Sequence, residues 1–149
     1  MNGDEKRVLV IDDNEQDADM TARCLRRAGI YRIELARDGI EGLDMLLHRG
    51  LWMALPPEPF DLVLLDVKMP RLSGFEVLEQ IRATPGLQPP PIVMWTSSSL
   101  ADDRAQAHAL GASDYRVKPI DFGEFRQALA DIARRWLAAG SNPPDGTPV

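Results

Sequence analysis

Residues 60–70 read FDLVLLDVKMP, an apolar run that ends on a carboxylate. From Leu62 to Leu65 the run contains no polar residue and no alternation, which is typical of a strand covered on both faces. Asp66 ends the run, and Pro70 cannot extend a strand because it has no backbone N–H to donate. The stretch therefore predicts a central strand of a parallel sheet with an aspartate at its carboxyl end.

Apolar runs and helical patterns alternate along the rest of the chain. Four more short apolar runs predict strands, and stretches with apolar residues three and four positions apart predict helices. The expected strands are 8–11, 33–35, 62–65, 92–95 and 113–117, and the expected helices are 18–28, 39–49, 74–83, 101–110 and 121–137, with residues 50–59 as a proline-rich loop. Strands that alternate with helices form a parallel sheet covered on both faces, so we expect one α/β domain.

The helical spacing also predicts which side chains face the sheet. These inward residues are Ile40, Leu43, Leu46 and Leu47 in the second expected helix, and Phe122, Phe125, Leu129, Ile132 and Trp136 in the last. At the end of the last helix, Trp136 and Leu137 have less sheet left to cover them. A contact with a partner protein is therefore a second interpretation of this end of the stripe.

Length, charge and cysteine content narrow the class of protein. The chain has 149 residues, with 44% hydrophobic and 27% charged residues, which suits one globular domain with a full core. Its net charge of -6 argues against a nucleic-acid-binding surface, and no apolar run approaches the roughly 18 residues of a membrane span. The single cysteine, Cys24, excludes an intrachain disulfide and a thiolate metal site. We expect a cytoplasmic protein that binds neither nucleic acid nor membrane.

Polar side chains follow four of the expected strands. In parallel α/β sheets the ligand binds beyond the carboxyl ends of the strands, and those ends carry Asp12, Asp13, Asp66, Thr96 and Lys118. Three carboxylates in one place repel one another, and oxygen ligands in this number suit Mg2+. With Mg2+ bound, Asp66 can accept a phosphoryl group while Lys118 and Thr96 take phosphoryl oxygens.

Each of these residues also has an ordinary structural interpretation. Asp12, Asp13 and Asn14 precede a helix, where acidic and amide side chains act as caps. Thr96 is a common type of strand-end residue, and Lys118 could be a solvated surface lysine. The combination of all these residues at one sheet edge favours the phosphoryl site, although one of the aspartates could both cap the helix and bind metal.

The pattern resembles the response-regulator receiver domain of two-component signalling, of the chemotaxis-regulator type. The resemblance covers about residues 7–138 and depends on five elements in order. These are Asp12-Asp13, Asp66, the Met69-Pro70 pair with Gly74, Thr96-Ser97, and Lys118-Pro119. It implies a flavodoxin-like sheet with strand order 2-1-3-4-5 and five helices on two faces. Residues 1–6 would then be an N-terminal extension and 139–149 a disordered tail.

The resemblance also implies a role for each site residue. Asp66 would be the phospho-acceptor, and Mg2+ would be held by Asp12 or Asp13, Asp66 and the backbone carbonyl of Lys68. Lys118 would bind the phosphoryl group, and the peptide bond between Lys118 and Pro119 would be cis. Like other receivers, the protein would catalyse only its own phosphorylation and dephosphorylation.

A two-state switch is the signalling mechanism that the family implies. When Thr96 moves to the phosphoryl oxygen, it would vacate space that Tyr115 fills, which remodels the face made by 101–110, 113–117 and 121–137. Homodimerisation through this face is expected. Tyr115 as a plain core aromatic remains the alternative.

The resemblance suggests the partners as well. The phosphoryl donor would be a sensor histidine kinase or a histidine phosphotransfer protein. No second domain is expected after residue 138, so the signal would leave through contact with another protein. The proline-rich insertion at 50–59 and the Trp136-Leu137 ending are similar to the stand-alone receivers that partner bacterial phytochrome kinases.

Two other classes of protein remain as alternatives. One is a phosphorylation-independent interaction module that keeps the fold but not the chemistry. Such modules usually lack the acceptor aspartate or the lysine, and this sequence has both. The other is a Mg2+-dependent phosphatase of the haloacid-dehalogenase type, which carries its nucleophile on the first strand, whereas the expected nucleophile Asp66 follows the third.

Overall fold

The computed structural model describes residues 5–138. The predicted tail at 139–149 and residues 1–4 of the predicted N-terminal extension lie outside this range. The elements are β1 (Arg7–Ile11), α1 (Glu15–Arg27), β2 (Arg32–Ala36), α2 (Gly39–Leu46), the 3-10 helix η2 (Gly50–Ala54), β3 (Leu62–Leu65), α3 (Gly74–Arg82), β4 (Ile92–Thr96), α4 (Ala101–Ala109), β5 (Asp114–Val117) and α5 (Phe122–Leu137).

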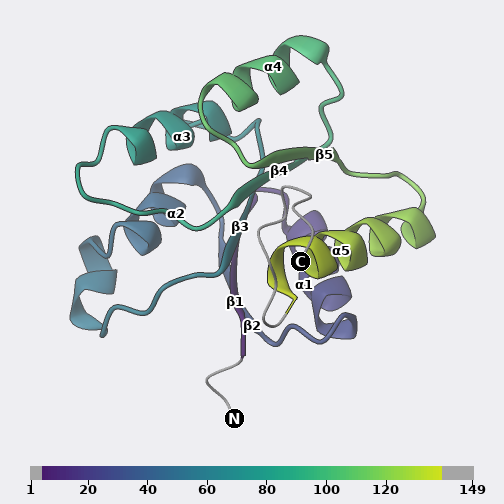
Figure 1. Ribbon diagram of the computed structural model, residues 1–149, viewed down its shortest axis with the longest axis horizontal. Helices are drawn as coiled ribbons and strands as arrows, with labels where there is room; N and C mark the ends of the chain where they lie inside the picture. Colours follow the sequence, from purple (N-terminus) through teal and green to yellow (C-terminus); the bar gives the residue numbers. More distant parts are fainter. Residues whose placement is uncertain (1–4, 139–149) are drawn as a thin grey trace.

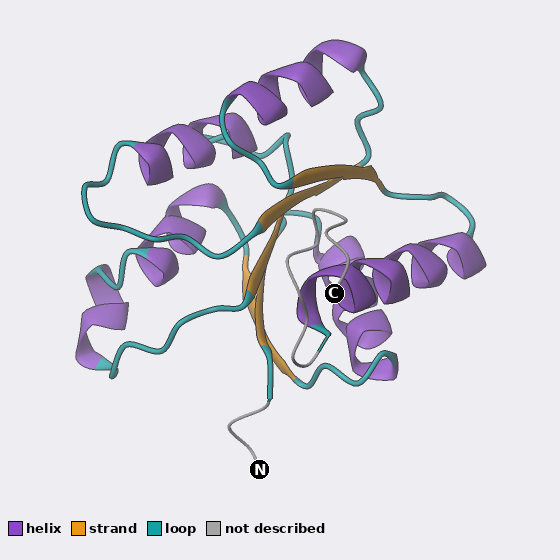
Figure 2. Cartoon of the chain, in the orientation of Figure 1, coloured by secondary structure: helices purple, strands orange, loops and turns teal. Residues whose placement is uncertain are grey.

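The five strands form one parallel sheet in the order β2-β1-β3-β4-β5. Helices α1 and α5 lie on one face of the sheet, and α2, α3 and α4 lie on the other (Figure 1). Figure 2 shows the strands between these two layers of helices. The predicted fold class and the strand order 2-1-3-4-5 are thereby confirmed.

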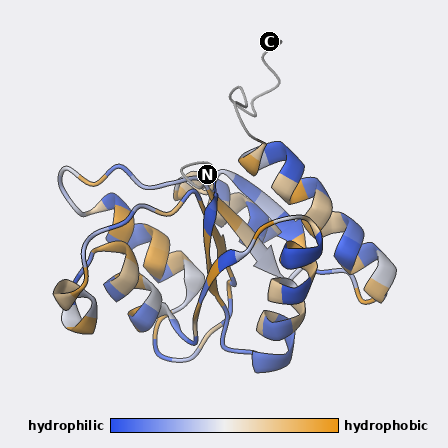
Figure 3. Cartoon of the chain, turned by 90° about the horizontal axis from the view of Figure 1, so that it is seen from below, coloured by the Kyte–Doolittle hydropathy of each residue, from blue (hydrophilic) through white to orange (hydrophobic). Residues whose placement is uncertain are grey.

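Two hydrophobic clusters, one on each face, hold the helices to the sheet. β3 is buried along its whole length, as its continuous apolar run predicts. The cluster on the α2, α3 and α4 side includes Leu65, and the cluster on the α1 and α5 side includes Leu64. Figure 3 shows the helices banded with hydrophobic and hydrophilic residues, which is the amphipathic pattern that this packing requires. None of the helices between residues 5 and 138 is long and apolar enough to cross a membrane.

Trp95 on β4 anchors the α1 and α5 layer. Its ring packs edge-on against Phe125 of α5, with 5.0 Å between ring centroids. Its indole N–H donates a hydrogen bond to the Thr21 hydroxyl of α1 at 3.0 Å, and both side chains are buried. Because a buried indole N–H without a partner costs free energy, this bond fixes where α1 sits against β4.

Two inward-facing predictions are wrong at helix starts. Ile40 is 42% exposed and Phe122 is 54% exposed. Both lie in the first turn of a helix that begins at the carboxyl edge of the sheet, where little sheet remains beneath them. Leu137 shows the opposite error: it is buried in the α1 and α5 cluster, and Trp136 packs against the same cluster. The end of α5 is therefore part of the core.

The segment between α2 and β3 also differs from its prediction. α2 ends at Leu46 and not at Arg49, because His48 and Gly50 take positive φ values of 55° and 64° that break the helix. The expected loop at 50–59 begins with the 3-10 turn Gly50–Ala54. Trp52 of this turn packs against the core cluster on the α2, α3 and α4 side, and this contact anchors the turn to the domain.

Candidate functional site

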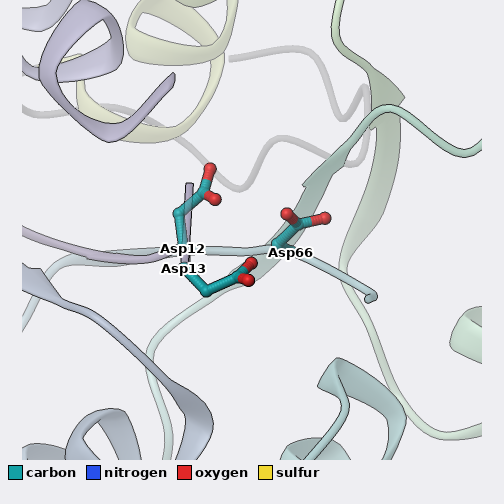
Figure 4. Close-up of side chains that lie close together, drawn as sticks. All are labelled: Asp12, Asp13 and Asp66. Atoms are coloured by element: carbon teal, nitrogen blue, oxygen red, sulfur yellow. The ribbon is translucent and has the colours of Figure 1, made fainter. Parts of the chain in front are cut away.

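The carboxyl ends of β1 and β3 bring three aspartates together. β1 pairs with β3 so that Ile11 lies beside Leu65, and the residue after each strand is an aspartate. One carboxylate oxygen from each of Asp12, Asp13 and Asp66 lies within 4.8 Å of the others (Figure 4). The structure thus places these residues in one cluster, as the sequence predicts.

The cap of α1 is supplied by a neighbour of the cluster. The Asn14 side chain accepts a hydrogen bond from the backbone N–H of Asp17 at 3.0 Å, so Asn14 is the residue that caps α1. Asp12 instead accepts from the Asn14 N–H at 2.9 Å. Helix capping therefore does not explain the two aspartates, and Asp12 Oδ2 lies 2.7 Å from Lys118 Nζ.

Asp66 is oriented by its own strand end. Its Oδ1 accepts a hydrogen bond from the Val67 N–H at 2.8 Å, and the residue is only 8% exposed. Gly74 permits this arrangement, because a Cβ at position 74 would lie 2.2 Å from the Asp66 carbonyl oxygen. The Gly74 N–H donates to the Val67 carbonyl at 2.8 Å and so joins α3 to the loop after β3.

Lys118 brings a positive charge into the cluster from the end of β5. Its Nζ lies 2.7 Å from Asp12 Oδ2, 3.0 Å from Asp17 Oδ2 and 3.6 Å from Asp66 Oδ2, with the side chain only 5% exposed. The solvated-lysine interpretation is therefore wrong. Asp17 is a member of this network that the sequence analysis missed. Its position four residues after Asp13, in the first turn of the first helix, was the available signal.

Burial and charge shift the proton affinities in this network. Burial raises the pKa of Asp12 to about 6, against the opposing effects of Lys118 and of the Asn14 N–H. Burial also works against the charged form of Lys118, but Asp66 and Asp12 outweigh it and hold the pKa of Lys118 above its ordinary value. The ammonium is thus fixed in its charged form beside the carboxylates.

Of the predicted switch residues, Thr96 ends β4 and Tyr115 lies within β5. Thr96 is 1% exposed, and its hydroxyl accepts a hydrogen bond from the Ser98 N–H at 3.3 Å. Tyr115 is 6% exposed, and its hydroxyl donates to the Ser98 carbonyl at 2.9 Å. Tyr115 therefore already occupies a buried position, with Thr96 bonded to its own loop.

A shallow cavity of about 470 Å3 lies next to the aspartates. Its lining residues are Asp13, Val67, Lys68, Met69, Pro70, Ser73, Phe75 and Asp103. Lys68 therefore lines the same space as Asp13. Asp103, in the first turn of α4, is a second lining acid that the sequence analysis did not single out. Loop 67–70 and the start of α4 thus form the walls around the acidic cluster.

One prediction about this site is wrong. The peptide bond between Lys118 and Pro119 is trans, and residues 5–138 contain no cis peptide bond. The trans form is the lower in energy for a bond before proline, by roughly 0.5–1 kcal/mol. The Lys118 N–H donates a hydrogen bond to the Thr96 carbonyl at 2.7 Å, so Lys118 stays joined to the end of β4 while its bond to Pro119 is trans.

The fold and the acidic site together define a receiver-type signalling domain. The family profile described as the response regulator receiver domain matches residues 8–130, so the chain belongs to this family. This membership favours a response regulator over an aspartate-nucleophile phosphatase.

Similar proteins and structures agree with the family. The chain is 35% identical over 138 residues to the probable methanogenesis regulatory protein FilR2 of Methanothrix harundinacea, covering 91% of this chain and 86% of FilR2. It spans only 31% and 51% of two other curated relatives.

Solved response regulators share the fold over nearly the whole chain. The phosphorylated cyanobacterial phytochrome response regulator RcpA matches with a TM-score of 0.83 and 26% identity, covering 95% of this chain and 99% of RcpA. The Mn2+-bound form of response regulator Rcp1 matches with a TM-score of 0.81 and 27% identity, covering 93% of this chain and 99% of Rcp1.

Proposed function

We propose that this chain is a response regulator that accepts a phosphoryl group on Asp66 and passes the signal on by contact with another protein. One observation carries the proposal. The Asp66 carboxylate lies within 4.8 Å of two other carboxylates, with the Lys118 ammonium 3.6 Å away. A nucleophilic carboxylate, a fixed cation and a set of hard oxygen ligands are the groups that phosphoryl transfer needs.

The chemistry of Asp66 follows from its hydrogen bonds. Oδ1 is held by the Val67 N–H, and Oδ2 is the oxygen nearer Lys118. A carboxylate oxygen forms a bond to the phosphorus of a phosphohistidine while the P–N bond breaks. The imidazole nitrogen keeps the electron pair of that bond and takes up a proton. Attack of water on the phosphorus later releases inorganic phosphate and restores the carboxylate.

Lys118 acts as the fixed cation in this reaction. Its ammonium neutralises negative charge as phosphoryl oxygens approach Asp66, and its buried position limits competition from water. Thr96 lies at the end of the neighbouring strand, where its hydroxyl can donate to a phosphoryl oxygen after leaving the Ser98 N–H. Both residues therefore act on the charge that the transferred group carries.

The donor set fits Mg2+. Asp12, Asp13, Asp66 and the backbone carbonyl of Lys68 would hold the ion, and the acidic cluster is composed of the oxygen ligands that Mg2+ prefers. A bound Mg2+ would supply positive charge to the carboxylates and to the phosphoryl oxygens. The Mn2+-bound form of Rcp1, a neighbour with the same fold, supports a divalent cation in this site.

The neighbours also suggest the partners. RcpA is a phosphorylated phytochrome response regulator, and its chain and this one match almost end to end. We propose a cytoplasmic response regulator with its receiver domain at 7–138. Its phosphoryl donor is a histidine kinase of the bacteriophytochrome type or a histidine phosphotransfer protein. Its proposed homodimer uses the face formed by α4, β5 and α5.

Intact mass after incubation with acetyl phosphate tests the chemistry. We expect one phosphoryl adduct in the presence of Mg2+, and none in excess chelator or in Asp66→Asn. Asp61→Asn is the matched control, because Asp61 lies at the opposite end of β3 and accepts the Arg7 N–H at 2.8 Å. An adduct that persists in Asp66→Asn would place the phosphoryl group elsewhere. No adduct under any condition would favour the phosphorylation-independent module.

A further inference from the structure

Tyr115 is held in its buried orientation by contacts that the chain makes on its own. The phenol hydroxyl donates to the Ser98 carbonyl at 2.9 Å, and the residue is 6% exposed. The partner that holds the Tyr115 hydroxyl is therefore the loop after β4.

Arg104 of α4 covers the Tyr115 ring. Its guanidinium carbon lies 4.8 Å from the ring centroid, within the range of a cation–π interaction. The same guanidinium donates from Nη1 to the Tyr115 backbone carbonyl at 3.2 Å. One side chain thus contacts both the ring and the backbone of Tyr115. Rotation of the ring toward solvent would have to displace it.

The residue before Arg104 holds the acceptor of the tyrosine. The Asp103 carboxylate accepts a hydrogen bond from the Ser98 hydroxyl at 2.6 Å, and the Ser98 carbonyl in turn accepts from Tyr115. Two successive residues of α4 therefore hold the tyrosine. Arg104 covers the face of its ring, and Asp103 binds the loop whose Ser98 carbonyl accepts from its hydroxyl.

We propose that Arg104 is a positioning residue that keeps Tyr115 buried in the protein that carries no phosphoryl group. Asp103 and Arg104 together form a latch on the face of α4, β5 and α5, which then presents a buried tyrosine before any signal arrives. The signalling meaning of the latch rests on the proposed function, whereas its existence does not.

Fluorine NMR can observe the latch directly. The chain has two tyrosines, so incorporation of 3-fluorotyrosine gives two resonances, one from Tyr115 and one from Tyr31, which is 69% exposed. Tyr31→Phe assigns them. The change in each resonance between H2O and D2O reports solvent access to the ring. The measurement uses the full chain in excess chelator, with no phosphoryl donor.

We expect a small solvent effect for Tyr115 in the wild-type protein. Arg104→Gln removes the cation and should raise the population of exposed Tyr115 about fivefold, from the usual strength of an exposed cation–π contact. Arg104→Lys keeps a cation and should recover part of the protection. Arg82→Gln is the matched control, because Arg82 donates to the Ala109 carbonyl at 2.8 Å at the other end of α4 and should leave Tyr115 unchanged.

Two results would overturn the proposal. An unchanged Tyr115 resonance and solvent effect in Arg104→Gln would show that the guanidinium does not hold the ring. An equal change in Arg82→Gln would show general loosening of α4 and no specific latch. Neither result depends on phosphorylation, so failure of the latch is distinguishable from failure of Asp66 to form an adduct in the mass experiment.

Discussion

Replacement of Asp12 by asparagine should stabilise the metal-free protein at neutral pH. Asp12 is 3% exposed, and burial raises its pKa from 3.8 to about 6. A folded state with a raised carboxyl pKa binds a proton that the unfolded chain has already lost. The protein therefore loses stability as the pH rises from about 4 through 6, and above pH 6 the whole cost is present. Asparagine carries no charge and avoids this cost.

The size of the effect follows from the same pKa. The pKa of Asp12 differs by roughly two units between the unfolded and folded states. At about 1.36 kcal/mol per unit, this difference lowers the stability of the wild type by at most about 3 kcal/mol at pH 7.5. The amide of Asp12→Asn keeps an oxygen that can accept from the Lys118 ammonium, which also retains Asp17. The Lys118 ammonium keeps carboxylate partners in the variant, and the gain should be positive but smaller than this upper value, because the ion pair with Asp12 is lost.

Urea unfolding measures this prediction at pH 4.5 and pH 7.5, in excess chelator. The free energy of unfolding of Asp12→Asn should exceed that of the wild type at pH 7.5, and the difference should fall to about 1 kcal/mol at pH 4.5, just above the unfolded pKa. Added Mg2+ should stabilise the wild type far more than the variant, since it binds the folded state. Asp13→Asn is the control: its side chain is exposed, so stability in chelator should change by less than about 0.5 kcal/mol.

Two results would refute this reasoning. One is an Asp12→Asn variant that is equally or less stable than the wild type at pH 7.5 in chelator. The other is a stability difference that is the same at both pH values, because a pH-independent gain cannot come from a titrating carboxyl.

Three further predictions concern other parts of the molecule. Gly74→Ala should lose several kcal/mol of stability and weaken Mg2+ binding, because its Cβ would meet backbone atoms at 2.2 and 3.0 Å. Gly29→Ala is the control: its Cβ meets nothing within 4 Å, so the variant should lose only about 1–2 kcal/mol because of the positive φ of Gly29. Thr21→Val should cost about 1–3 kcal/mol in urea unfolding by leaving the Trp95 indole N–H unpaired, and a smaller loss would mean that the bond is dispensable. Lys118→Met should destabilise the protein by about 3–5 kcal/mol in chelator at pH 7.5, with much of the loss recovered by Mg2+; no loss in chelator would contradict the charge balance of the cluster.

The sequence predicts the sheet and the acidic cluster for the same physical reason. Parallel strands end at one edge, so residues that follow separate apolar runs meet there, as Asp12 and Asp66 do. Side-chain partners across the fold are different. The pairing of Lys118 with Asp17 depends on how α1 is placed over the sheet, which the periodicity of α1 alone does not fix.

The helix ends and the switch were less predictable. Ile40 fits the helical periodicity, yet it is exposed in the first turn of α2 at the edge of the sheet. Periodicity predicts which face of a helix is apolar, but not how much of the sheet that face covers. The buried orientation of Tyr115 is a choice between side-chain rotamers. It depends on Arg104 and the Ser98 carbonyl, which come from other elements, so no local pattern in the sequence encodes it.

The position of Trp95 beside Thr96 has a mechanical consequence. Successive residues of a strand point to opposite faces, so a shift of the end of β4 moves a site residue and an anchor of the opposite layer together. The indole donates a hydrogen bond to Thr21 of α1 and packs edge-on against Phe125 of α5. A displacement of Thr96 is therefore passed on to α1 and α5, the two helices on the opposite face of the sheet from α4 (Figure 1). Movement of the end of β4 would therefore change the packing on both faces of the sheet. The fluorescence emission of the buried Trp95 indole can report this movement.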